Sequence, residues 1–436
     1  MTPQSSFMVL APITRGREQE LRDLLASMNQ PRRPGMADAE NALVPFGQFE
    51  RPHFARFVVL EAPTAEDVTV YGLPPAGWQT SLAFLGDFDG PADTFVADLV
   101  ARAGAGLREV FAFCQDFFPD SDLLEWMKRH EQPSSASYVN WIGRTVVQIH
   151  EEQALHRALV SHLQNGAAQA SDGDSPVALH DRLVGFVDAE QQAGRLRLTP
   201  EAPTPLGWRL RNAIDKFGVP IALLVLAPFL LIASPLLVCQ LRSREKADPE
   251  IAPRPEGDYV RRAAEIEDHD ITNQFTVFGD IKPGRFRLWT TMFLLWLLNY
   301  STRHIFNRGY LTRVRTIHFA RWVLMNDRRR AFFASNYDGS VESYMDDFIN
   351  RVAWGINLVF SNFVGYPRTD WLIKRGARNE QVYKRLLRRH QLPTDVWYNA
   401  YPGLSVVDLE RNTRIRKGIE RRAITDREAR AWLSLL

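Results

Sequence analysis

"RPHFARFVV" (residues 51–59) and "TIHFARWVL" (residues 316–324) share the tetrapeptide HFAR, which begins at His53 in one and at His318 in the other. Three longer stretches also recur, in the same order along the chain. Several ordered matches at similar spacing are the signature of a repeated folding unit. We therefore interpret the chain as an internal duplication. The recurring stretches are "SFMVLAPITRGR" (6–17) with "QFTVFGDIKPGR" (274–285), "FDGPADTFVADLVARAGAGLREVFAF" (88–113) with "YDGSVESYMDDFINRVAWGINLVFSN" (337–362), and "KRHEQPSSASYVNWIGRTVV" (128–147) with "RRHQLPTDVWYNAYPGLSVV" (388–407).

Each copy predicts the same order of secondary structure. A short β-rich run at 7–13 precedes "REQELRDLLASM", whose leucines recur at helical spacing. "HFARFVVLEAP" and "TSLAFLGDFDG" are strand-like, a long helix follows the second of them, and "ASYVNWIG" predicts a last strand before a trailing helix. The order βαββαβ is that of the ferredoxin-like fold. We expect an α+β protein in which tandem ferredoxin-like repeats pair through their sheets as an intrachain pseudo-dimer.

The domain boundaries follow from the recurring stretches and from changes in composition. Polar stretches rich in Pro, Gly and Ala, such as "QNGAAQASDGDS" (164–175), predict linkers beside a hydrophobic insert. The predicted boundaries are repeat 1 at 1–163, a linker with a helical connection at 164–216, a membrane segment at 217–241, a second linker at 242–273, and repeat 2 at 274–436.

The hydrophobic insert is "FGVPIALLVLAPFLLIASPLLVCQL" (217–241), 25 residues without a charge. That exceeds the roughly 20 residues that a helix needs to cross a bilayer. Three prolines within it predict either a kinked span or a hairpin that returns to its own side. A single crossing would place the two repeats on opposite sides, so pairing of the repeats favours an element that returns. Basic residues flank both ends, and the positive-inside rule therefore gives no orientation.

Two further features indicate contact with lipid. "LWTTMFLLWLLNY" (288–300) is too short to cross a membrane comfortably, and it predicts an interfacial helix or a buried one. Residues 259–436 carry 30 Lys and Arg against 18 Asp and Glu, whereas residues 1–258 carry 23 against 33. A basic C-terminal half predicts an anionic lipid surface as partner, unless two solvated surfaces simply differ in sign.

Three further features of the sequence limit the partners, the cellular compartment and the kinds of site that we expect. The basic C-terminal stretch (411–430) alternates with acids and lacks interleaved aromatic residues, so we expect a solvated helix near lipid and no nucleic-acid partner. Two cysteines, Cys114 and Cys239, fit a reducing compartment and form no CxxC metal motif. The N-terminal residues do not read as a secretory signal. We expect a membrane protein whose main domains are cytoplasmic, with no metal site.

Polar residues that recur in both copies are the candidate site residues. Asp89 and Asp338 each end a strand just before a helix, where an Asp can cap helix N–H groups. Arg56 and Arg321 lie on strands and need acidic partners if covered, so an Arg–Asp pair within each copy is one expectation and a catalytic pair is another. The other recurring polar residues are His53 with His318 and His130 with His390.

"GDFDG" (86–90) matches a Gly-x-x-Asp-Gly turn, and with two ferredoxin-like units the chain resembles the dye-decolourising peroxidases. The resemblance implies haem as cofactor, with Asp89 and Arg56 on its distal side and His318 as its ligand. The matching position in the other copy is also a candidate in each case: Asp338 for Asp89, Arg321 for Arg56, and His53 for His318. The second copy reads "SNYDG" (335–339) and lacks the first glycine.

The second copy, through "IHFARW", "SNYDGSVESYMDDFI" and "VFSNFVGYPRT", also resembles an uncharacterised group of bacterial membrane-associated proteins. Walker, GxGxxG, HExxH and GxSxG motifs are absent from the sequence.

These observations lead to two hypotheses about the function. One is a non-catalytic membrane-associated binding platform or accessory protein, with an apolar cleft for a lipid-like or planar ligand. The alternative is a haem-dependent, peroxidase-like oxidoreductase.

Overall fold

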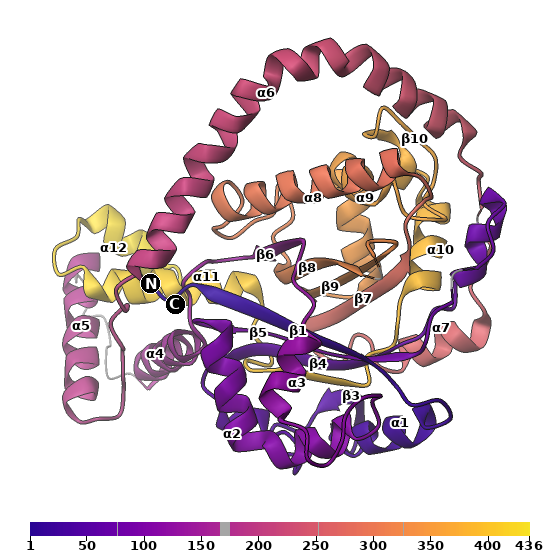
Figure 1. Ribbon diagram of the computed structural model, residues 1–436. Helices are drawn as coiled ribbons and strands as arrows, with labels where there is room; N and C mark the ends of the chain where they lie inside the picture. Colours follow the sequence, from indigo (N-terminus) through magenta and orange to yellow (C-terminus); the bar gives the residue numbers. More distant parts are fainter. Residues whose placement is uncertain (76, 166–174, 252, 326) are drawn as a thin grey trace.

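The computed structural model describes residues 1–436 except 76, 166–174, 252 and 326, and it shows a mixed α+β architecture (Figure 1). Residues 166–174 of the linker predicted at 164–175 thus lie outside the described part of the chain. One sheet has six strands in the order β1-β5-β4-β12-β3-β2, and a second has four in the order β6-β8-β9-β7. Neighbouring strands run antiparallel except β12 and β3.

The strands are β1 (Gln4–Pro12), β2 (Asn29–Gln30), β3 (Arg33–Ala37), β4 (Pro52–Leu60), β5 (Ser81–Asp89), β6 (Ala136–Val139), β7 (Thr272–Asp280), β8 (Ile317–Met325), β9 (Arg330–Asp338), β10 (Thr369–Asp370), β11 (Lys374–Arg375) and β12 (Val396–Asn399). The α-helices are α1 (Glu18–Ala26), α2 (Ala92–Phe111), α3 (Leu123–Arg129), α4 (Val146–Gln164), α5 (Pro176–Gln192), α6 (Leu206–Ala247), α7 (Gly257–Ala264), α8 (Arg285–His304), α9 (Val341–Phe360), α10 (Glu380–His390), α11 (Val406–Glu420) and α12 (Asp426–Leu433). Short 3-10 helices cover Phe46–Gln48, Ala65–Tyr71 and Gly376–Arg378.

The last strand of each half joins the sheet of the other half. β6 pairs with β8, with Ala136 opposite Trp322, and β12 pairs with β4, with Val396 opposite Phe57. The sequence predicted each of these strands inside its own unit. We call the parts of the chain outside the central insert the N-terminal segment (1–163) and the C-terminal segment (274–436). The reciprocal exchange of β6 and β12 ties these two segments together.

The two sheets pack face to face, and helices cover their outer faces (Figure 1). Side chains of β1, β4 and β5 meet those of β7, β8 and β9 in a shared apolar cluster. Helices α1, α2 and α3 pack on the outer face of the six-stranded sheet, and α8, α9 and α10 on that of the four-stranded sheet. The predicted contact between the two segments through their sheets is present.

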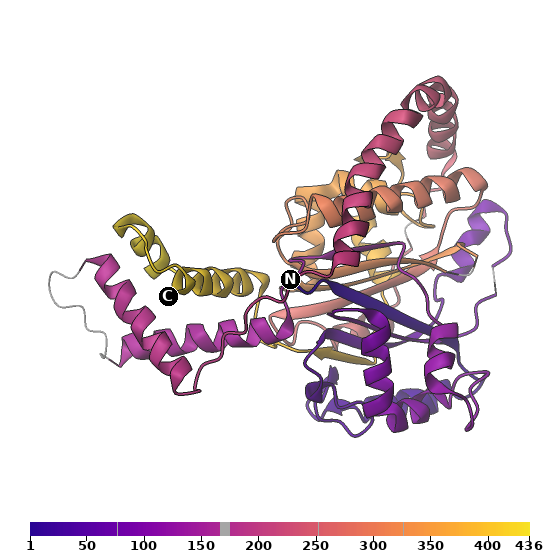
Figure 2. The same ribbon diagram turned by 60° about the vertical axis from the view of Figure 1, so that its left-hand side comes forward.

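Helices α4, α5, α11 and α12 form a separate cluster at one side of the sheets (Figure 2). The basic stretch 411–430, expected as one solvated helix, is divided between α11 and α12 and helps to build this cluster. Arg416 is buried there, with its guanidinium 2.9 Å from a carboxylate oxygen of Glu420 and 2.6 Å from the carbonyl oxygen of Thr199. The expectation of one helix was wrong. Most of the basic side chains, such as Arg414, Lys417 and Arg427, are exposed, while the apolar residues of the stretch pack against α4 and α5.

Helix α6 contains the whole apolar insert and forms an arch over α8 (Figures 1 and 2). Its prolines, Pro220, Pro228 and Pro235, are about two helical turns apart. At 100° per residue they lie within about 80° of one another around the helix axis. Each proline bends the helix away from its own side, so the three bends add in one direction. The turn expected at the centre of this segment is therefore replaced by one continuously bent helix.

Both ends of the arch are fastened to the same body. At the N-terminal end, Asp215 pairs with Arg303 at 2.6 Å. At the C-terminal end, Arg242 pairs with Asp370 at 3.0 Å. Just beyond the helix, Asp248 binds two buried cations, Lys282 at 2.8 Å and Arg287 at 2.6 Å. The described residues thus place both ends of α6 at the C-terminal segment.

Candidate functional site

The first candidate cluster joins the end of β5 to the beginning of α4. His53 is buried on β4, and its Nε2 lies 3.0 Å from Oδ1 of Asp89. The second carboxylate oxygen of Asp89 accepts the backbone N–H of Val146 at 2.8 Å. Nδ1 of His53 is 3.2 Å from the hydroxyl of Tyr401, which belongs to the other segment.

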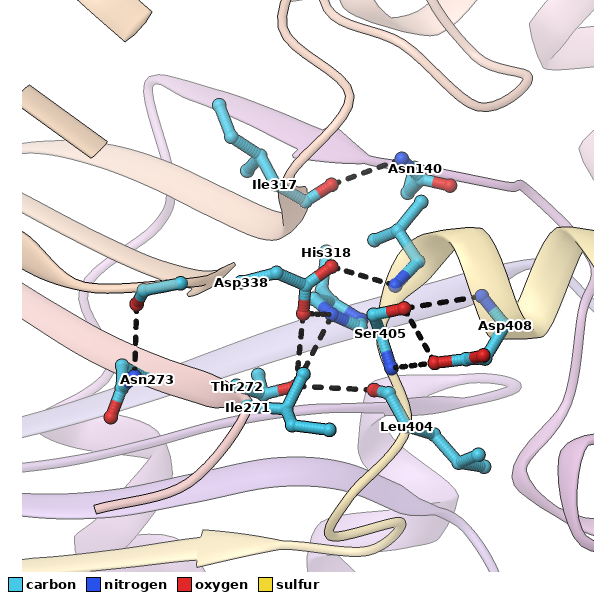
Figure 3. Close-up of polar contacts among 12 residues, drawn as sticks. Asn140, Ile271, Thr272, Asn273, Ile317, His318, Asp338, Leu404, Ser405 and Asp408 are labelled. Atoms are coloured by element: carbon cyan, nitrogen blue, oxygen red, sulfur yellow. Dashed lines mark hydrogen bonds and ion pairs between the residues drawn. The ribbon is translucent and has the colours of Figure 1, made fainter. Parts of the chain in front are cut away.

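The same arrangement occurs in the C-terminal segment (Figure 3). Nε2 of His318 lies 2.6 Å from Oδ1 of Asp338, and Thr272 donates its hydroxyl to the same oxygen at 3.0 Å. The other carboxylate oxygen accepts the backbone N–H of Val406 at 2.7 Å. Ser405 caps α11 through its hydroxyl.

The two aspartates therefore do cap helices, but not the helices that follow them directly. Asp89 binds the start of α4 and Asp338 the start of α11, each just after the exchanged strand of its own segment. A carboxylate is stabilised there by unpaired N–H groups and by the positive end of the helix dipole. Helix α9 is capped instead by Ser340, which accepts from the N–H of Ser343 at 3.2 Å. The His–Asp pairs fasten the chain back to its own sheet after each exchange.

The two buried arginines cross the interface between the sheets. The guanidinium of Arg56 donates to the carbonyl oxygen of Phe275 at 3.2 Å, to that of Ser335 at 3.0 Å, and to the side chain of Asn336. Burial, partly offset by the charge of Asp87, lowers the pKa of Arg56 to about 9. It remains protonated near neutral pH and binds the strands of the opposite segment.

Arg321 repeats this pattern in the opposite direction. It donates to the carbonyl oxygens of Phe7 at 2.6 Å and Gly86 at 2.8 Å, and it pairs with the carboxylate of Asp87. The predicted Arg–Asp pairs within each copy, Arg56 with Asp89 and Arg321 with Asp338, were therefore wrong. The side chains on this face of each strand enter the other segment, so their partners are found there.

These residues do not fit a haem. Nε2 of His318 is bonded to Asp338, both ring nitrogens of His53 have partners, and aromatic rings fill the space around the two histidines. Rings that contact a histidine include that of Phe54, 5.6 Å from His318, and that of Phe319, 5.0 Å from His53. Asp89 and Arg56 belong to two different bonded groups, and all six predicted site residues are tied to protein partners.

The third recurring pair, His130 and His390, lies near the outer edge of each sheet. Nδ1 of His390 is 3.1 Å from the carbonyl oxygen of Phe278 and 3.2 Å from the hydroxyl of Thr64, and burial lowers the pKa of His390 to about 4. His130 is only half-buried and stacks on Trp126 with ring centroids 4.1 Å apart. Both histidines have packing roles in the described structure.

A second kind of site is an apolar cavity of about 270 Å³ in the C-terminal segment. Its walls are α8, α9 and the outer face of the four-stranded sheet, with few polar atoms. Small-molecule sites are concave and mostly apolar, with volumes of about 300–1,000 Å³, so this cavity is close to the lower end of that range. Its lining residues include Leu294, Leu297, Ala320, Phe333, Trp354 and Gly355.

The matching place in the N-terminal segment is filled by the protein. Gly106 on α2 corresponds to Gly355 on α9 in the recurring stretches, and a Cβ at Gly106 would lie 2.1 Å from the carbonyl oxygen of Leu43. A Cβ at Gly355 would meet no atom within 4 Å. The loop before β4 thus fills this place over the first outer face, while among the described residues the space beside Gly355 under α8 stays open.

Apolar side chains are exposed above this cavity. The most apolar 18-residue window of α6 has none of its residues buried. On α8, Trp289 is 64% exposed, Phe293 44% and Trp296 39%. An exposed apolar surface of this kind marks a contact with lipid or with another protein.

Sequence reasoning found the apolar helices and expected an apolar cleft, but it did not predict where the cavity lies. The available signal was the stretch between the first two long strands of each segment. In the N-terminal segment it holds α1 and a polar and aromatic loop, and in the C-terminal segment it holds the apolar helix α8. No family model, curated protein or solved structure matches this chain.

Proposed function

We propose that this protein is a monotopic membrane protein: a cytoplasmic binding platform that embeds the α6 arch in one leaflet and accommodates an apolar ligand under α8. One observation carries the proposal. The apolar middle of α6 is exposed along its length, while both of its ends are bonded to the same body. A span that crossed the bilayer would separate those ends.

The size of the arch is consistent with one leaflet. The 25 uncharged residues at 217–241 make a helix about 38 Å long. An arch of that length that bends no further than a semicircle rises at most about 12 Å, and half of the hydrocarbon core is about 15 Å thick. The top of the arch would therefore lie within the acyl chains of the nearer leaflet.

Two of the three carbonyls that the prolines of α6 free have a hydroxyl partner, as suits a dry environment. Each proline leaves the carbonyl four residues earlier without its helical donor, and lipid supplies no replacement. The carbonyl of Lys216, freed by Pro220, accepts the hydroxyl of Tyr300 at 3.1 Å. The carbonyl of Leu231, freed by Pro235, accepts the hydroxyl of Ser234 at 2.8 Å.

The surface beneath the arch has the composition of a membrane interface. The exposed tryptophans of α8 are the residue type that gathers at headgroup level. Cationic side chains stand at both feet of the arch, among them Arg209, Arg211, Lys216, Arg244 and Lys246. They would attract the anionic headgroups of the cytoplasmic leaflet.

We further propose that the two segments derive from one duplicated ferredoxin-like unit. The recurring sequence stretches support this, as do the reciprocal Arg56 and Arg321 contacts and the matching His–Asp pairs. In this interpretation the doubled unit supplies a rigid base, and the C-terminal unit has been adapted to hold the membrane element and the ligand.

Topology is the decisive experiment. Cys114 is buried, which raises the pKa of its thiol to about 12, so Cys239→Ser gives a background without a reactive cysteine. Into it we would introduce Arg211→Cys or Lys246→Cys, one at each foot of the arch. In sealed vesicles, a membrane-impermeant maleimide should label both variants from the same side.

Leu226→Cys, at the centre of the arch, is the matched control and should be protected until detergent is added. Labelling of Arg211→Cys and Lys246→Cys from opposite sides would show a single crossing and would exclude the monotopic arrangement. Equal labelling of all three variants would show that the arch stays in water.

A further inference from the structure

Trp354 on α9 borders two hollows. One is the apolar cavity, and the other is a neighbouring groove of about 870 Å³. The side chain of Trp354 is 48% exposed. Four cations line the groove: Arg368, Lys374, Arg375 and Arg378. The cavity and the groove therefore adjoin at Trp354, the first apolar and the second basic.

The positive charge of the groove is only partly neutralised. Lys374 and Arg378 are exposed, and within the described residues neither side chain has a hydrogen-bond or ion-pair partner. Arg375 lies 3.8 Å from Asp370, whose carboxylate is already paired with Arg242. Glu250 also lines the groove, 3.8 Å from Arg368. Four cations therefore face two carboxylates, and the groove presents a net positive surface suited to an anion.

The groove lies at the foot of the arch. The carboxylate of Glu245, near the end of α6, accepts from the backbone N–H of Trp371 at 3.0 Å and of Leu372 at 2.8 Å. Both of those residues have positive φ, so these bonds hold the turn between β10 and β11 in its conformation. Arg242 stacks on the ring of Trp371 at 4.8 Å. With the arch in the acyl chains, its foot and the groove would lie among headgroups.

We propose that the cavity and the groove together bind one anionic phospholipid. One of its two acyl chains enters the cavity between α8 and α9, and its phosphate lies against Lys374 and Arg378. Trp354 contacts the lipid between the chain and the phosphate. The inference rests on the proposed membrane association, because the ligand is drawn from the leaflet in which the arch is embedded.

Charge and shape both favour this ligand. An apolar cavity with few polar groups excludes a free anion, and unpaired cations at its rim select a negative headgroup over a neutral one. The test uses the full chain in a neutral detergent, titrated with phosphatidylglycerol that carries pyrene on one acyl chain. The same titration with pyrene-labelled phosphatidylcholine measures the contribution of headgroup charge.

The expected result is saturable binding of one lipid per chain, with phosphatidylglycerol at least tenfold tighter than phosphatidylcholine. Gly355→Leu should weaken binding of both lipids at least tenfold, because the new side chain enters the cavity. Gly185→Leu, in an open position on α5, is the matched control and should bind as the wild type does. Lys374→Gln with Arg378→Gln, both on the surface, should bring phosphatidylglycerol down to the affinity of phosphatidylcholine.

Unchanged phosphatidylglycerol binding in Gly355→Leu would overturn the cavity assignment. Equal affinity of the wild type for the two lipids would overturn the role of the groove. Displacement of the lipid by millimolar inorganic phosphate would show a site for a free anion and would overturn the assignment of a lipid. Flotation with phosphatidylcholine vesicles separates this inference from the proposed function. Every variant should still float if the arch inserts, whereas a wild type that does not float would refute membrane association itself.

Discussion

The N-terminal and C-terminal segments share their buried polar residues and differ in what covers their outer faces. Each has one arginine that enters the other sheet and one His–Asp pair that binds a helix start. Over the first sheet, the loop at Leu43 presses against Gly106, while over the second the space beside Gly355 is open. The contacts that the two segments share stabilise the fold, and the open space that differs between them is available for function.

The largest expected effect concerns the arginine exchange. Arg321 pairs with the carboxylate of Asp87, whereas Arg56 binds the neutral amide of Asn336. Arg321→Met should lower the free energy of unfolding by about 3–5 kcal/mol, because it leaves a buried charge without its partner. Arg56→Met should cost less. Urea unfolding in detergent measures both.

Adding Asp87→Asn to Arg321→Met should restore part of the loss, since the uncompensated charge is removed. If the double variant were as unstable as the sum of the two single variants, the carboxylate would not be the reason for the difference between the segments.

The next largest expected effect is the contribution of His390 to the pH dependence of the free energy of unfolding. Burial lowers its pKa from 6.5 to about 4, so folding favours the neutral ring. The stability that it contributes is complete above pH 6.5 and is lost as the pH falls through about 4, by about 3 kcal/mol in total. Unfolding of wild type and His390→Leu at pH 7 and pH 4.5 should show their difference shrinking at the lower pH.

Asp395 titrates with the opposite sign, because burial raises its pKa to about 6, but it is present in both proteins and its effect cancels in the comparison. A difference between wild type and His390→Leu that did not change with pH would mean that the ring is not held neutral by burial.

The two glycines test the filled and the open outer faces directly. Gly106→Ala should destabilise the protein by about 1–3 kcal/mol, because its methyl group overlaps the backbone of Leu43. Gly355→Ala should be neutral or should stabilise the protein by about 0.5–1 kcal/mol, since alanine favours a helix and the space is free. Melting temperatures of the two variants give the comparison, and equal destabilisation would show that the second face is closed as well.

The smallest effect is expected at the helix starts. Asp89→Asn and Asp338→Asn should each cost about 1 kcal/mol, and by similar amounts, as for the loss of a capping carboxylate. Urea unfolding measures this. A haem band that appears in the wild type and disappears in His318→Ala would contradict a purely structural role for these pairs.

Much of the architecture could be predicted from local sequence. The HFAR stretches form β4 and β8, the apolar run at 288–300 lies within α8, and the insert is helical throughout. The exchange of β6 and β12 could not be predicted, because near-identical strands pair equally well in either sheet and side-chain periodicity gives no preference. The partners of Arg56 and Arg321 were missed for the same reason.

An apolar cleft was expected, but its position could not be predicted, for a different reason. Gly106 and Gly355 occupy matching positions in the recurring stretches, and only the surrounding loop shows that one is covered and the other open. The curvature of α6 could have been predicted from the sequence, since the spacing of its prolines places all three on one side of the helix. Local sequence thus predicts elements and their bends, while pairing between distant segments decides where space remains.

The exchanged strands set the order in which the protein can be completed during synthesis. The edge of β4 that pairs with Val396–Asn399 stays open until almost the whole chain has left the ribosome. By then the apolar arch has already emerged from the ribosome. A nascent chain in this condition carries an unprotected strand edge and a bare apolar helix, both of which promote aggregation. Early insertion of the arch into the bilayer would cover the apolar helix. The open edge of β4 would stay exposed until β12 is made.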